Sequence, residues 1–415
     1  MALADVPLVL ILAGIAAYVV LGGADFGAGF WYFTAPGERG RALRDHTHHA
    51  MGPVWEANHV WLIFVLVIAW TAYPGAFGAI MSTLYVPFFI AAVGIILRGT
   101  TYAVRGWVTE WGEERVVGAI FGPSSVLTPF ALGAAIGGIA SGRVPADGAG
   151  DAVSSWLNPT SLTIGALAVA TSAYLAANWL TADAARAGDE SLVRAFRTRA
   201  LVTGVLTGGL ALAGLIVLHS DARRIFDGLT SGAGLAAVIA SALAGAATLA
   251  FVARGRFEVA RYSGAVAVAA IVAGWAIAQS PDLLPGLTVH QAAASHGTLV
   301  ALLVAVPIGA LILIPSLAWL FSLVLGGRFD EGPEEPGSTL RAAAGADGRP
   351  IGDGGLPAGA LARAAVAVAV VGVGLMRAFD GGVGLGAGVV LLLAACALGA
   401  AAALPLVAAG GDQPS

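Results

Sequence analysis

The sequence has no lysine, a single cysteine and few charged residues of any kind. Charged residues make up 11% of the 415 residues, whereas soluble domains carry about 25%. So little charge cannot cover a water-exposed surface of this length, which excludes an ordinary soluble protein. The lone Cys396 excludes an intrachain disulfide and a cysteine-based metal site.

Hydrophobic residues are abundant instead, at 58% of the chain with a mean hydropathy of +0.85. Many uncharged runs reach about 20 residues, the length a helix needs to cross a bilayer. They lack the alternation of a membrane β-barrel strand, so helices must satisfy the backbone. Residues 7–22 resemble a signal peptide, but no basic region precedes them, and we interpret them as the first spanning helix. The sequence predicts an all-α polytopic membrane protein.

The predicted domain organisation is one large unit followed by a tail. Residues 1–328 form the main membrane domain, residues 329–358 are a linker rich in glycine, proline and acidic residues, and residues 359–415 are an appended apolar helical hairpin and tail. Nine core transmembrane helices are expected in the main domain, at residues 6–33, 54–73, 76–98, 116–140, 160–182, 200–219, 229–253, 262–280 and 297–326. Two weaker spans follow at 359–377 and 386–408.

The arginines predict the orientation of these spans. Seventeen of the 21 basic residues follow odd-numbered spans, and only three lie in loops after even-numbered ones. Basic loops stay in the cytoplasm, so the N-terminus is expected outside and the odd loops inside.

Two carboxylates fall inside or at the edge of spans, where ionisable groups usually have a function. Asp25 lies in residues 22–29 (GGADFGAG) and Glu56 in residues 52–63 (GPVWEANHVWLI). The first two spans are antiparallel neighbours, so both carboxylates are expected near the inner face, with His59 one helical turn beyond Glu56. This pattern indicates a proton path. The alternative is structural, with Glu56 stabilising a helix N-terminus and His59 bonding between helices.

These motifs resemble subunit II of the cytochrome bd quinol oxidases. The resemblance continues through Tyr73-Pro74, the third span with Tyr85, Phe88 and Arg98, Asn158-Pro159, and residues 287–295, and covers about residues 5–326. It implies two four-helix bundles plus one further helix. It also implies a bacterial cytoplasmic (inner) membrane location.

The resemblance further implies a subunit of an enzyme complex that oxidises quinol and reduces dioxygen to water. Haems b and d belong to the partner, subunit I, so this chain is expected to ligate no haem or metal and to hold no catalytic residue. A structural quinone, a small single-span accessory subunit and membrane lipids are the other expected ligands and partners, and nucleic acid is not expected.

Carried onto this sequence, the resemblance makes Asp25 and Glu56 the carboxylates of a proton path, extended by His59. Trp55, Asn58 and Trp61 would line the path or pack at the subunit interface. The family often has an aspartate where this chain has Gly22, an aspartate in place of Glu56 and a glutamine in place of His59, so the number of relay groups is open.

Arg98 ends an apolar run and has two interpretations. It pairs with Glu56, Asp25 or Glu110 near the inner face, or it extends to the membrane surface.

The histidines suggest haem ligands, but the pattern favours simpler roles. His46, His48 and His49 are expected in a solvated loop, because their spacing matches no common zinc site. His219 and His296 are expected at the outer interface, although facing histidines at one depth could hold a haem.

A proton-coupled secondary transporter is the alternative function. Transporters often repeat an interrupted span in both halves, whereas here the carboxylates cluster in the first two spans, which disfavours that alternative.

Overall fold

The structure, a computed structural model, describes residues 3–35, 40–51, 55–105, 111–325 and 367. The chain divides into two units, Met1–Phe329 and Asp330–Ser415, and all described residues except 367 lie in the first. The predicted linker at 329–358 and, apart from residue 367, the predicted hairpin at 359–415 lie outside the described residues.

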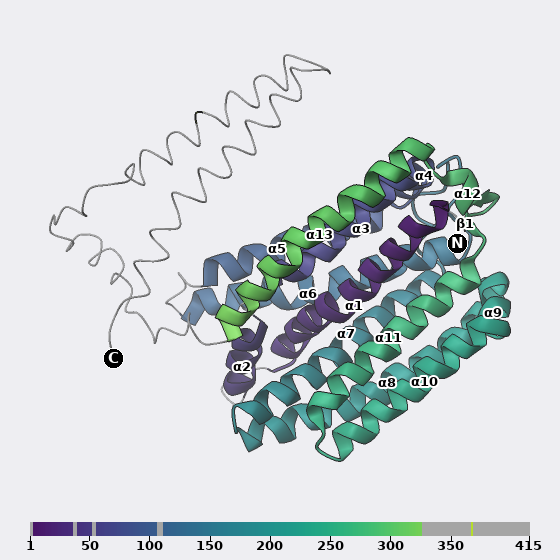
Figure 1. The fold of residues 1–415 in the computed structure, drawn as a ribbon. Coiled ribbons are helices and arrows are strands. Elements are labelled where there is room, and N and C mark those ends of the chain that lie inside the picture. Colours follow the sequence, from purple (N-terminus) through teal and green to yellow (C-terminus); the bar gives the residue numbers. More distant parts are fainter. Residues whose placement is uncertain (1–2, 36–39, 52–54, 106–110, 326–366, 368–415) are drawn as a thin grey trace. The chain divides into compact units, whose positions relative to one another are not determined.

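The described part is almost wholly helical (Figure 1). Seven helices are long and apolar enough to cross a membrane, or eight if one bent pair counts as a single span. The chain is therefore an integral membrane protein built from helices. The long helices are α1 (Val6–Phe33), α3 (Trp55–Ala72), α5 (Tyr85–Arg105), α6 (Trp111–Ala140), α7 (Pro159–Arg186), α8 (Glu190–Asp221), α10 (Gly232–Ala253), α11 (Phe257–Gln279) and α13 (His296–Leu325).

Shorter elements connect the long helices. They are η1 (Leu3–Asp5), α2 (Arg41–Met51), α4 (Pro74–Thr83), α9 (Arg223–Leu229), β1 (Asp282–Leu284), β2 (Leu287–Thr288) and α12 (Val289–Ala292). The two strands pair antiparallel as a small hairpin next to α12.

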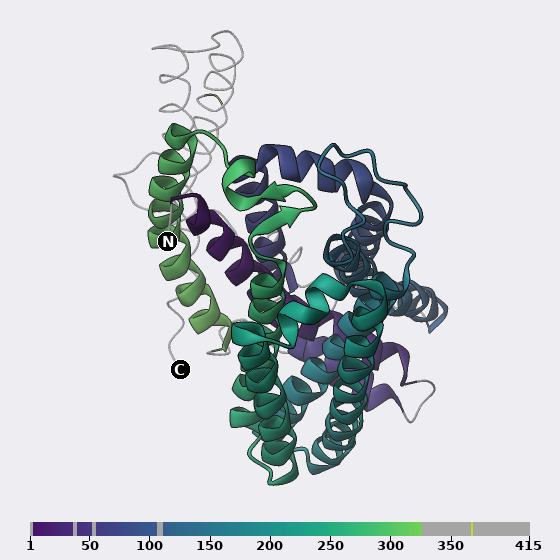
Figure 2. The same cartoon turned by 90° about the vertical axis from the view of Figure 1, so that its right-hand side faces the viewer.

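The long helices pack in two groups, which Figures 1 and 2 show from two directions. Helices α7, α8, α10 and α11 contact one another in one group, and α1, α3, α5 and α6 in the other. Helices α1 and α6 also pack along α7 and so join the groups, while α13 contacts α3. Residues on α1 are therefore close to both groups.

Two helix starts follow directly from the sequence. Asn158 caps α7, because its side-chain Oδ1 accepts the Ser161 N–H at 2.9 Å and Pro159 occupies the first turn, where no N–H is needed. Asp189 caps α8 by accepting the N–H groups of Ser191 and Leu192 at 2.9 and 3.0 Å. The pair Asn158-Pro159 is thus a helix-start signal.

The span predicted at 76–98 is not one continuous helix. The structure has two helices there, α4 and α5, which meet at Leu84 with a bend of 82°. Pro87 explains the break, because proline has no N–H to donate to the carbonyl of Thr83 and its ring clashes with that carbonyl.

The prediction of a solvated loop around His46 is wrong. Residues 41–51 form helix α2, and the His46 side chain is only 11% exposed. Its Nε2 lies 3.2 Å from the carbonyl oxygen of Leu180 on α7, and its ring lies 5.7 Å from the ring of Phe196 on α8. His46 thus fixes α2 against the second helix group. The side chains of His48 and His49 lie outside the described part.

Helices α1 and α7 approach most closely at Gly27. A Cβ atom there would lie 1.9 Å from the carbonyl oxygen of Ser172 and 2.8 Å from the Cβ of Ala176. Small residues permit such backbone contact between membrane helices. The contact that joins the two groups therefore requires glycine at this position.

We expect Gly27→Ala to destabilise the protein by about 1–3 kcal/mol, because the new methyl group overlaps the α7 backbone. The measurement is the thermal midpoint of the purified membrane protein. Gly245→Ala on α10 is the matched control, since nothing lies within 4 Å of its Cβ position. Equal midpoints for the two variants would contradict the close approach.

Candidate functional site

The site begins with an ion pair between Asp25 of α1 and Arg98 of α5. Arg98 Nη2 lies 2.6 Å from Asp25 Oδ1, and Nε lies 3.3 Å from Oδ2. Nη2 also donates to the Asp25 main-chain oxygen at 2.6 Å. Both residues are fully buried. Asp25 is one of the three partners that the sequence allowed for Arg98, and the side chains of the other two, Glu56 and Glu110, lie outside the described part.

The rest of the guanidinium is enclosed by α6 and by an aromatic ring on each of two helices. Arg98 Nη1 donates to the hydroxyl of Ser125, and its Cζ lies 4.5 Å from the ring centre of Phe121 and 5.2 Å from that of Phe26. Gly29 leaves room for this group, because a Cβ there would overlap Arg98 and Ser125. The pair is therefore shielded and partnered, as a buried charge requires.

His59 of α3 lies beside α1 on the N-terminal side of the ion pair. Its ring makes edge contacts with Tyr18 at 6.0 Å and Phe26 at 5.9 Å between ring centres. Asn58 next to it is buried. Phe26 contacts both His59 and Arg98, so it connects the histidine to the ion pair.

The structure describes the other predicted site residues only in part. Trp61 lies on α3 with its ring against Phe64 at 6.3 Å. Trp55 and Glu56 lie in the first turn of α3, but their side chains are outside the described part, as is Glu110. The approach of Glu56 to Asp25 therefore stays a prediction.

Two partners of Arg98 were missed from the sequence, namely Ser125 and Phe121 on α6. Nothing in the sequence around them indicates a contact with Arg98, because serine and phenylalanine are common in apolar spans. A weak signal exists in the spacing of four residues, which puts both on one helix face.

Three of the described histidines contact other side chains or the backbone. His219 Nε2 lies 2.6 Å from Arg223 Nη1, and its ring packs at 4.9 Å on Phe226. His290 Nε2 lies 3.4 Å from Asp5, and His46 contacts the α7 backbone. Among the described residues, no group of three or more His, Cys, Asp or Glu side chains could hold a metal ion.

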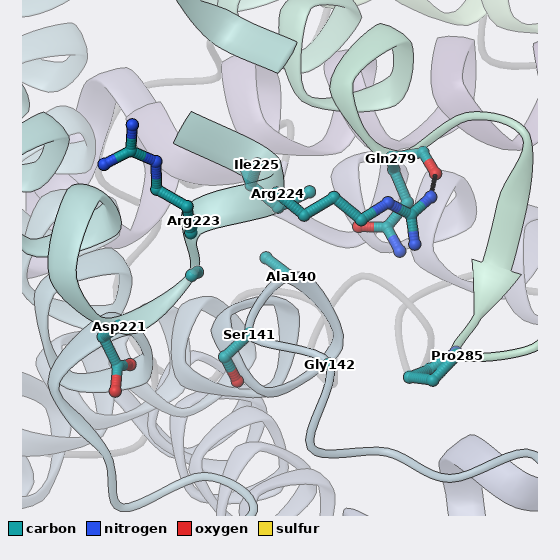
Figure 3. Close-up of a pocket in the computed structure, with 10 residues that line it drawn as sticks. Ala140, Ser141, Gly142, Asp221, Arg223, Arg224, Ile225, Gln279 and Pro285 are labelled. Carbon is teal, nitrogen blue, oxygen red and sulfur yellow. Dashed lines mark hydrogen bonds between the residues drawn. The ribbon is translucent and has the colours of Figure 1, made fainter. Parts of the chain in front are cut away.

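A separate hollow of about 270 Å³ lies where α6, α8 and α11 end and α9 begins (Figure 3). Two arginines line it, but both are engaged. Arg224 donates to the Gln279 main-chain oxygen at 2.6 Å and pairs with Asp282 at 2.9 Å, while Arg223 pairs with Asp227 at 3.0 Å. These pairs leave the hollow without a free charge, and it is a weaker candidate than the Asp25 site.

Comparisons with known proteins identify relatives of the whole helical unit. The profile of the family described as Cytochrome bd terminal oxidase subunit II matches residues 3–324. Cytochrome bd ubiquinol oxidase subunit 2 of Bacillus subtilis (strain 168) is 32% identical over 136 residues, which are 31% of this chain and 38% of the relative. This chain thus aligns with well under half of that relative's length.

A solved structure is also similar. A chain of the bd oxidase from Geobacillus thermodenitrificans superposes with a TM-score of 0.61 at 26% identity. The match covers 78% of this chain and 99% of that one.

We expect Asp25→Asn and Arg98→Met each to destabilise the protein by about 3–5 kcal/mol, because each leaves a buried charge without its counter-ion. The double variant removes both charges and should be less destabilised than the sum of the two single changes. Thermal midpoints of the four proteins form the test. Additive losses would show that the two residues do not interact.

Proposed function

The chain belongs to the cytochrome bd terminal oxidase subunit II family, and from that membership we propose that it is the non-haem-ligating subunit of a complex that oxidises quinol and reduces dioxygen to water. The family match over residues 3–324 is the observation that supports this proposal. It favours the oxidase subunit over a proton-coupled transporter. The catalytic centre, with haems b and d, is proposed for the partner subunit I.

The chain's own contribution is proposed to be support of the haem subunit and proton delivery. The first group of helices holds the polar residues for this, with Asn58 buried and His59 packed against α1. We assign to Glu56 and His59 the transfer of protons from the cytoplasmic side. The N-terminus of the chain is proposed to lie outside. Because Arg98 binds both carboxylate oxygens of Asp25, we assign Asp25 to fixing the charge beside the path.

The proposed setting is the bacterial inner membrane, where Trp55, Asn58 and Trp61 line the path or the subunit interface. A structural quinone and a small single-span accessory subunit complete the proposed assembly. Residues 329–415 are proposed as a linker and an appended helical hairpin.

We expect Glu56→Gln to slow quinol-driven oxygen consumption of the assembled complex by about tenfold or more, because glutamine cannot take up and release a proton. Oxygen consumption per haem is the measurement. Glu190→Gln is the control, because Glu190 is exposed and forms only a surface pair with Arg194. Normal turnover of the Glu56 variant with intact haem would exclude proton transfer through Glu56.

We expect this chain, expressed without its partner and purified, to carry no haem. The reason is that the Nε2 atoms of His219 and His290 face Arg223 and Asp5. An absorption spectrum of the isolated chain against protein concentration is the measurement. One haem per chain would contradict the assignment of all haems to the partner.

A further inference from the structure

Tyr18 on α1 carries a buried hydroxyl that the ion-pair site does not use. The side chain is 8% exposed, and within the described part of the chain its hydroxyl oxygen has no hydrogen-bond partner. Leaving a buried hydroxyl unpaired costs about 1–3 kcal/mol. Such a group usually meets ordered water or has a chemical role.

Gly22 determines where this ring lies. A Cβ atom at position 22 would lie 2.9 Å from Cε2 of Tyr18 and 3.0 Å from its Cδ2. The ring therefore extends along α1 towards its C-terminal end, across the turn that has no side chain. Any larger residue at position 22 would compete with the ring for this space.

The Tyr18 ring packs in a cluster with two other rings. Its neighbours are the rings of His59, 6.0 Å away on α3, and Phe26, 6.3 Å away on α1. Tyr18, Gly22 and Asp25 follow the spacing i, i+4, i+7, which places them on one face of α1.

We propose that Tyr18 is a proton-relay residue, which passes protons through its hydroxyl between water beside His59 and water beside the Asp25–Arg98 pair. This inference rests on the proton-delivery role proposed above. In each step the hydroxyl oxygen accepts a proton from a donor water while its own proton moves to an acceptor water, so tyrosine stays neutral and no charge is left behind. Gly22 contributes by leaving the space in which the hydroxyl lies.

A purely structural role would require a different part of the Tyr18 side chain. Ring packing against Gly22, Phe26 and His59 needs only the aromatic ring, which phenylalanine also has. Relay needs the hydroxyl oxygen, which phenylalanine lacks. Tyr18→Phe therefore separates the two roles with little change in shape.

The experiment uses the assembled complex with Tyr18→Phe. We expect turnover per haem to fall by about tenfold, and the ratio of rates in H2O and D2O to rise because proton transfer becomes rate-limiting. Tyr174→Phe is the matched control, since Tyr174 is a buried tyrosine on α7 in the other helix group. Its turnover and isotope ratio should equal those of the parent.

A second pair of variants tests the relay even if the Tyr18→Phe complex fails to assemble with haem. In Tyr18→Ala the ring is absent, and adding Gly22→Asp puts a proton-carrying carboxylate into the same space. We expect the double variant to turn over faster than Tyr18→Ala alone, whether or not Tyr18→Phe retains haem. No gain from the carboxylate would overturn the relay.

Parallel measurement of Glu56→Gln distinguishes failure of the relay through Tyr18 from failure of proton delivery by this chain. If Glu56→Gln is slow while Tyr18→Phe has parental turnover and isotope ratio, the relay through Tyr18 is wrong and proton delivery stands. If both variants equal the parent, proton delivery by this chain is wrong, and the relay is wrong with it.

Discussion

The pairing of Asp25 with Arg98 is the interaction on which the first helix group depends. A lone charge in a low-dielectric interior is strongly unfavourable, and a pair is tolerated only when its remaining hydrogen-bonding groups are satisfied. Here Ser125 takes one of the remaining N–H groups, and Phe26 and Phe121 cover the guanidinium. One ion pair therefore fixes the relative positions of α1, α5 and α6, because each supplies atoms to it.

Helix α1 can hold this pair because glycines near Asp25 leave room for its neighbours. At Gly27 its backbone touches that of α7, while Gly29 and Gly22 make room for Arg98 and for the ring of Tyr18. The glycines of residues 22–29 therefore act at three different contacts. This explains why a motif with one charged residue is so rich in glycine, since each turn must admit a different neighbour.

The sequence was sufficient for features that depend on composition or on local spacing. Charge content and apolar runs predicted a helical membrane protein, and Asp25 was identified because an ionisable residue inside a span is rare. Pro87 indicated a possible kink in the span at 76–98, but the sequence did not distinguish a kink from the break at Leu84, because a proline in a membrane helix can also be tolerated. Ser125 and the docking of His46 could not be predicted, since both depend on contacts between segments far apart in the chain.

The ion pair also has a consequence for a proton that moves nearby. At an effective dielectric constant of about 20, a single charge 4 Å away changes the energy of a proton by about 4 kcal/mol. A lone carboxylate would therefore bind a passing proton tightly enough to slow its release. Arg98 opposes that attraction with a charge of the other sign at 2.6 Å from the same carboxylate. On the path proposed along His59 and Tyr18, a proton would therefore pass an ion pair rather than a lone carboxylate.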